Sequence, residues 1–195
     1  MYSLSKTKDK ILCIALREFN KHSTRVVTTN HIAKACEMSP GNLYYHYKNK
    51  EEIIFSLFEK MIFEWDEKPP ELENRSPDEI LHGQLNKTFE CVWQYRFIHR
   101  ELASLLEKDS ALKRMCNQVL QRRLKEVEGF ILLFEQVNVL QKLSDEQRAF
   151  IAQTALYYGL FWQPYLEVVG EKSTKANVMR GVQMIRLLLE PYLKP

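Results

Sequence analysis

The residues best suited to bind a polyanion lie close together, between positions 41 and 50 of this 195-residue chain. Phenol, imidazole and ammonium groups donate hydrogen bonds to phosphate oxygens, and an asparagine amide can pair with the edge of a base. A glycine among them lets the backbone approach a base closely. This chemistry makes the following residues candidates for contacts with a nucleic acid: Gly41, Asn42, Tyr44, Tyr45, His46, Lys48 and Lys50.

Two short helices joined by a tight turn are predicted to carry these side chains. Thr28 is suited to cap the first helix and Ser39 the second, where Pro40 then takes a position that needs no N–H donor. A helix of about eight residues is not stable alone, so the pair must pack against the longer helix predicted at residues 5–22. In such a helix-turn-helix, here at about residues 28–47, the second helix lies in the major groove of DNA.

Helical periodicity continues to the end of the chain, and no run shows the alternation of a β-strand. Polar residues 66–75, which include two prolines, are predicted to link a helix-turn-helix domain at 1–64 to a helical domain at 76–195. The fold is therefore expected to be all-α with about nine helices. Those after the helix-turn-helix are predicted near residues 50–65, 77–96, 98–106, 109–137, 145–168 and 173–190.

Serine and proline residues mark the limits of helices in the second domain. Ser76 and Ser144 are each followed three residues later by glutamate or glutamine, which is the pattern of a capping box. Pro164 falls within the helix predicted at 145–168, and it is expected to kink or end that helix because it has no N–H to donate.

Charge is unevenly distributed along the chain. Residues 1–50 contain nine lysines and arginines against three acidic residues, a net charge of +6, whereas the whole chain has +3 and the remainder therefore −3. A basic first quarter suggests a polyanionic partner for that part alone. No apolar run approaches the ~20 residues that span a bilayer, and the polar N-terminus is unlike a signal peptide. A cytoplasmic protein without a membrane partner is therefore expected.

The sequence contains no pattern typical of catalysis or metal binding. Its four cysteines form no C-x-x-C pair and no zinc-type cluster with histidine, so free thiols are expected. The chain also lacks a glycine-rich phosphate loop, a G-x-S-x-G elbow and an H-E-x-x-H motif. We therefore expect no enzymatic activity, no catalytic residues, no metal and no cofactor.

The stretch from Ser39 to Glu51, which reads SPGNLYYHYKNKE, resembles the DNA-binding domain of the TetR family of transcriptional repressors. The similarity extends over about residues 5–64. It implies that the phosphate backbone is contacted by Thr28, Tyr44, His46 and Lys50. It also implies that bases are faced by Pro40, Gly41, Asn42 and Tyr45. The predicted DNA-binding set is completed by Thr29, Ser39 and Lys48.

Two positions depart from the family pattern. Ser23, after the first helix, and Glu37, inside the turn, stand where the family often has glycine. Glycine is favoured where the backbone angle φ is positive, and another residue there costs about 1 kcal/mol. Either these two residues accept that strain or the local geometry differs.

The last two predicted helices, at 145–168 and 173–190, are apolar on more than one face. Such helices suit an isologous interface between two copies of the chain, and the resemblance also implies a homodimer formed by the last two helices. The alternative is that both helices only form the core of their domain. The predicted interface consists of Tyr157, Phe161, Val178, Val182, Ile185 and Leu189.

Aromatic residues of the second domain are candidates for an effector pocket. Rings with polar groups often line ligand cavities, although an aromatic stripe at helical spacing is also typical of an ordinary core. The candidate ligand-binding residues are Trp93, Phe97, Phe130, Phe134, Tyr158 and Trp162.

Together these features predict a sequence-specific DNA-binding transcription regulator. The favoured mechanism is a homodimeric repressor that leaves a palindromic operator when a small-molecule effector binds the second domain. The effector would shift the helix at about 50–64 and so change the spacing of the recognition helices. The alternative is a DNA-binding adaptor that a protein partner regulates, and activation in place of repression is also compatible with the sequence.

Overall fold

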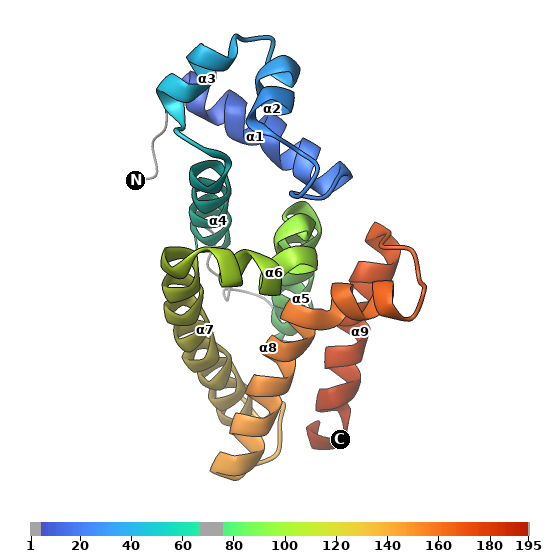
Figure 1. The fold of residues 1–195 in the computed structure, drawn as a ribbon. Helices are drawn as coiled ribbons and strands as arrows, with labels where there is room; N and C mark the ends of the chain where they lie inside the picture. Colours follow the sequence, from blue (N-terminus) through green and yellow to red (C-terminus); the bar gives the residue numbers. More distant parts are fainter. Residues whose placement is uncertain (1–4, 67–75, 195) are drawn as a thin grey trace. The chain divides into compact units, whose positions relative to one another are not determined.

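The fold was analysed in a computed structural model of the chain, which describes residues 5–66 and 76–194 (Figure 1). These residues form nine α-helices and no β-strand, so the predicted all-α class is confirmed. Most of the predicted linker, residues 67–75, lies outside the described ranges. The helices are α1 (Lys6–Lys21), α2 (Thr29–Ala35), α3 (Pro40–His46), α4 (Lys50–Asp66), α5 (Pro77–Gln94), α6 (Arg96–Lys108), α7 (Ser110–Gln136), α8 (Asp145–Val168) and α9 (Lys175–Leu189), followed by a 3-10 helix at Glu190–Tyr192.

Both predicted capping boxes are present. At the start of α5, the backbone N–H of Ser76 donates to Glu79 Oε2 at 2.7 Å, and the N–H of Glu79 donates to Ser76 Oγ at 3.3 Å. At the start of α8, Ser144 and Gln147 make the same reciprocal pair, at 2.9 and 3.2 Å. Each box satisfies two N–H groups that a helix leaves unpaired at its start.

Helix α8 continues through Pro164 to Val168. Of the two predicted effects of this proline, a kink or an end of the helix, the end is therefore wrong. Proline removes the hydrogen bond to the carbonyl one turn earlier and crowds that carbonyl, but the helix nevertheless continues for four more residues. Of the helices in the described residues, none is both long and apolar enough to cross a membrane.

The helices form two compact units. The first contains α1–α4 together with α6, and the second contains α5, α8, α9 and the part of α7 from Arg114 onward. This grouping differs from the predicted division into 1–64 and 76–195, because α6 packs with the helices that precede the linker. The ring centroids of Phe19 on α1 and Phe97 on α6 lie 5.1 Å apart.

The first unit is built around the buried face of α1. Helix α1 contacts α2, α4 and α6, and α2 in turn contacts α3. Ile32 of α2, Leu43 of α3 and Leu57 of α4 are fully buried with the apolar face of α1. The two short helices are therefore held from behind, as their length requires. The buried residues of α1 are Ile11, Leu12, Ala15 and Phe19.

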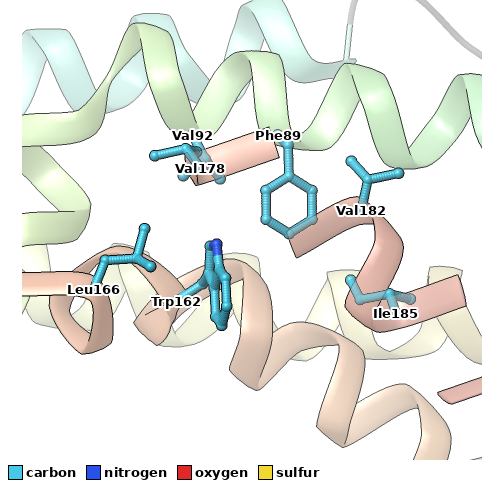
Figure 2. Packing of buried hydrophobic residues seen from close by; sticks show 7 residues of the cluster. All are labelled: Phe89, Val92, Trp162, Leu166, Val178, Val182 and Ile185. Atoms are coloured by element: carbon cyan, nitrogen blue, oxygen red, sulfur yellow. The ribbon is translucent and has the colours of Figure 1, made fainter. Parts of the chain in front are cut away.

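In the second unit, α5 and α9 cross at a glycine. Phe89 of α5 is fully buried and points toward α9. In Figure 2 its ring lies between Val182 and Trp162, which belong to the same apolar cluster. A Cβ atom built on Gly181 would overlap Cε1 and Cζ of the Phe89 ring. The absence of a side chain at Gly181 therefore lets the ring lie against the backbone of α9.

Candidate nucleic-acid interface

The turn between α2 and α3 contains a glutamate in the left-handed region. Glu37 has a φ of 56°, so it accepts the strain that its family position implied. Its N–H donates to the carbonyl of Lys34, and the N–H of Met38 donates to the carbonyl of Ala33, at 3.1 and 3.0 Å. These two bonds make a Schellman motif, which usually has glycine at the place of Glu37. Ser23, in contrast, does not have a positive φ.

Threonine and serine caps fix the start of each short helix, as predicted. Thr28 Oγ1 accepts from the N–H of His31 at 3.2 Å, and Ser39 Oγ accepts from the N–H of Asn42 at 3.2 Å. The Nδ1 atom of His31 accepts in return from the N–H of Thr28, which completes a capping box with histidine in the place of the usual glutamate.

Helix α3 has an inner and an outer side. Leu43 and, just after the helix, Tyr47 are buried, with exposed fractions of 0% and 3%. Tyr45 is 85% exposed and Tyr44 is 49% exposed, which is unusual for large aromatic rings. The residues of the helix that are exposed together are Pro40, Gly41, Asn42, Tyr44 and Tyr45. The structure thus brings the predicted base-facing residues onto one accessible side.

One contact between side chains joins α2 to α3 at this surface, and a second lies within α3. Thr29 Oγ1 and the Tyr44 hydroxyl lie 3.3 Å apart, within hydrogen-bond distance. The rings of Tyr45 and His46 meet edge to face with centroids 5.1 Å apart. His46 is half-buried and, with Glu51 among its neighbours, lines an open hollow of about 430 Å³.

Lysines 48 and 50, both predicted to contact DNA, lie in different environments. Lys48 is exposed. Lys50 is half-buried, and its Nζ donates to the backbone carbonyls of Thr24 and Val27. An ammonium group has three N–H donors, so Lys50 has at most one left for a phosphate. This internal role could not be predicted from local patterns, because it depends on a loop 23–26 residues earlier in the chain.

Tyr47 supports α3 from the inner side. Burial raises the pKa of its phenol, so the ring stays neutral at ordinary pH. The ammonium group of Lys8 lies over the ring, 5.3 Å from its centroid. Asn49 directly precedes α4, and its Oδ1 accepts from the N–H of Glu52 at 2.8 Å, as the side chain of a helix cap does.

The structure separates the predicted effector residues into three places. Phe97 lies in the first unit against Phe19, so it is not part of a pocket formed within the second unit. Trp93, Tyr158 and Trp162 belong to one apolar cluster of the second unit. The second cluster of that unit contains the remaining two, Phe130 and Phe134.

The predicted dimer residues on α9 need correction. The four predicted side chains on α9 are at most 5% exposed and pack in the core of their own chain, so a partner chain cannot reach them. Tyr157 and Phe161 on α8 are 63% and 40% exposed and remain available. The error arose because periodicity identifies an apolar face but not what covers it. The corrected residues are Val178, Val182, Ile185 and Leu189.

A buried glutamine on α8 was missed by the sequence reasoning. Gln163 is 1% exposed, and neither its Nε2 nor its Oε1 has a hydrogen-bond partner among the described residues. The signal that could have found it is the position of a polar residue between Trp162 and Leu166, which are both buried. Buried amides in proteins are normally paired with protein, water or ligand.

The capped pair α2 and α3 has the form of the helix-turn-helix found in DNA-binding proteins. A family model described as "Bacterial regulatory proteins, tetR family" matches residues 11–57, and one described as "Bacterial transcriptional repressor" (TetR) matches residues 66–195. The chain belongs to the TetR family of transcriptional regulators. The family is one of regulators that bind DNA.

Individual relatives agree with this assignment. The chain is 27% identical over 136 residues to the HTH-type transcriptional regulator QacR of Staphylococcus aureus, an alignment that covers 68% of this chain and 71% of QacR. A solved TetR-family regulator from Marinobacter aquaeolei is 30% identical, with a TM-score of 0.87 and coverage of 98% and 93%. A TetR regulator from Haloarcula marismortui, 12% identical with a TM-score of 0.78 and coverage of 98% and 100%, shares the fold.

Proposed function

We propose that this protein is a cytoplasmic repressor that binds a specific palindromic DNA operator as a homodimer and leaves it when a small molecule binds the second unit. The observation that carries the DNA-binding part is the exposure of α3. Tyr45 and Gly41 are accessible on a short helix whose inner residue, Leu43, is fully buried. Such a helix gains nothing for stability from an 85% exposed tyrosine, whereas a major groove would cover it.

The homodimer is supported by apolar side chains that the chain leaves uncovered on α8 and α9. Leu187 on α9 is 57% exposed, and Tyr157 on α8 is 63% exposed. Pairing of two copies by these faces would bury them isologously and place two recognition helices for a two-fold symmetric operator. The exposed apolar residues of the two helices are Phe150, Tyr157, Phe161, Tyr165, Val168, Met184 and Leu187.

The unpaired amide of Gln163 supports an effector site in the second unit. An unsatisfied buried amide costs about 1–3 kcal/mol, which a ligand with both a donor and an acceptor could recover. A small neutral molecule would displace fewer of the side chains that cover this 1% exposed residue than a protein partner would. Protein-controlled release remains the alternative, because the exposed apolar face of α8 could also receive another protein.

Methionine at position 163 is expected to stabilise the ligand-free protein. The two side chains have similar shape, and Gln163→Met removes the unpaired amide, so the melting temperature should rise by about 2–4 °C for each kcal/mol gained. Differential scanning calorimetry measures this, with exposed Gln153→Met on the same helix as the matched control. A lower melting temperature for Gln163→Met would mean that the amide is paired within the protein.

Selection of DNA from a random pool by the purified full-length protein tests the proposed function. We expect enrichment of a two-fold symmetric sequence, with half-sites about one helical turn or a multiple of it apart. A chemical library is then screened for release of the selected duplex, and a releasing compound should act less well on Gln163→Met. The absence of any enriched sequence would exclude specific DNA binding, and release only by cell proteins would favour the adaptor.

A further inference from the structure

The loop between α1 and α2 is held by charged side chains from two other helices. It runs from His22 to Thr28 and is closed by hydrogen bonds from the N–H groups of Val26 and Val27 to the carbonyl of Ser23, at 3.0 and 3.1 Å. Thr24 and Val27 are buried although they lie in a loop, with exposed fractions of 6% and 3%. The loop therefore has a fixed place in the first unit.

Glu101 of α6 accepts hydrogen bonds from this loop at three donors. The N–H of Thr24 lies 3.2 and 3.1 Å from the two carboxylate oxygens, and Thr24 Oγ1 lies 2.5 Å from Oε2. The hydroxyl of Ser23 adds a longer bond of 3.4 Å to Oε2. Ser23, one of the two departures from the family pattern, thus takes part in the contact with Glu101.

Arg100, beside Glu101, binds the end of α1. Its Nη2 donates to the carbonyls of Phe19 and His22 at 2.9 and 2.8 Å, and to Glu101 Oε1 at 3.0 Å. The side chains of Arg100 and Glu101 are only 22% and 13% exposed, so these bonds are partly shielded from water. Shielded bonds to charged groups are stronger than exposed ones.

Lys50 of α4 completes the arrangement by binding the carbonyl group of the same residue, Thr24. The N–H of Thr24 is bound by Glu101, and the carbonyl of Thr24 is bound by Lys50, which also holds the carbonyl of Val27. Val27 directly precedes Thr28, the cap of α2. The position of the cap is thus tied to α6 as well as to α4.

We propose that Glu101 is a positioning residue for DNA binding, which acts through Thr24 and the α1–α2 loop to set the place of Thr28 and helix α2. This inference rests on the proposed DNA-binding function of α2 and α3. The residues on which DNA binding depends would then include one on α6, a helix outside the helix-turn-helix. Glu101 does not touch DNA in this proposal, so it changes affinity without contributing a phosphate contact.

The test is the variant Glu101→Gln, which keeps the size of the side chain but replaces one acceptor oxygen by a donor. Binding to the duplex selected from the random pool is measured by fluorescence anisotropy over a series of salt concentrations. Affinity is expected to fall about tenfold, the size of one bond to a charged group, while the slope against salt stays unchanged. The exposed Glu107→Gln on the same helix is the matched control.

Hydrogen exchange supplies a readout that does not need DNA. Peptides covering residues 23–31 are expected to exchange faster in Glu101→Gln than in Glu107→Gln, at a temperature where both variants are folded. Thr24→Val is the second variant, and its loss of affinity should not add to that of Glu101→Gln, because both break the same contact. Affinity and exchange equal to the control, or strictly additive losses, would overturn the proposal.

The result for the wild-type protein separates this proposal from the function on which it rests. If the wild-type protein selects no duplex, the proposed function fails before any variant is compared, and the positioning role fails with it. If the wild-type protein binds and Glu101→Gln binds equally well, the function stands and only the role of Glu101 is wrong.

Discussion

A glutamate at position 41 is expected to abolish operator binding while the fold remains intact. Gly41 is exposed near the start of α3, and a Cβ atom there would lie 4.0 Å from Ser39 Oγ, an ordinary contact. An acidic residue in the first turn also suits the helix dipole. The new side chain would, however, enter the DNA interface and oppose the phosphates. Like charges brought together cost several kcal/mol, so affinity should fall about a hundredfold or more.

Anisotropy with the selected duplex measures the loss, and calorimetry measures the melting temperature. Gly129→Glu is the matched control, because Gly129 on α7 is also exposed and has no atom within 4 Å of a built Cβ. We expect Gly129→Glu to bind almost as well as the wild-type protein. Equal binding by Gly41→Glu would show that α3 does not lie against DNA.

Alanine at position 181 is expected to destabilise the protein, although alanine normally favours a helix over glycine. The added methyl group would overlap the Phe89 ring, which is fully buried. Overpacking of this kind costs about 1–3 kcal/mol. The melting temperature should therefore fall by about 2–4 °C for each kcal/mol lost.

Gly129→Ala provides the opposite expectation in the same protein. Its new methyl group meets open space, so only the better helix propensity remains and stability should rise by about 0.5–1 kcal/mol. Calorimetry on both variants gives the difference directly. An equal rise for Gly181→Ala would contradict the close crossing of α5 and α9.

Local signals in the sequence were sufficient to predict the helices and their starts. The hydroxyl groups of Thr28, Ser39 and Ser144 cap helices as expected, because a cap depends only on residues three positions apart. The exposed residues of α3 were also found, since the spacing of Leu43 and Tyr47 fixes which side of the helix is buried.

The remaining features depend on contacts between distant residues, which periodicity does not reveal. Glu101 binds Thr24 across 77 positions, and Arg100 binds the carbonyl of Phe19 across 81. The return of α6 to the first unit follows from these contacts. The wrong assignment of Val182 and its neighbours to a dimer interface has the same origin. The sequence pattern of an apolar face is the same whether its own chain or a partner chain covers it.

The membership of α6 in the first unit has a consequence for hybrid regulators. A chimera joined at the linker would transfer α1–α4 to a foreign effector domain but leave Glu101 and Arg100 behind. The transferred helices α1–α4 would then pack against the α6 of another protein, whose residues suit a different α1–α2 loop. Hybrids made from this protein should therefore carry α6, or at least its residues 97–101, together with the helix-turn-helix.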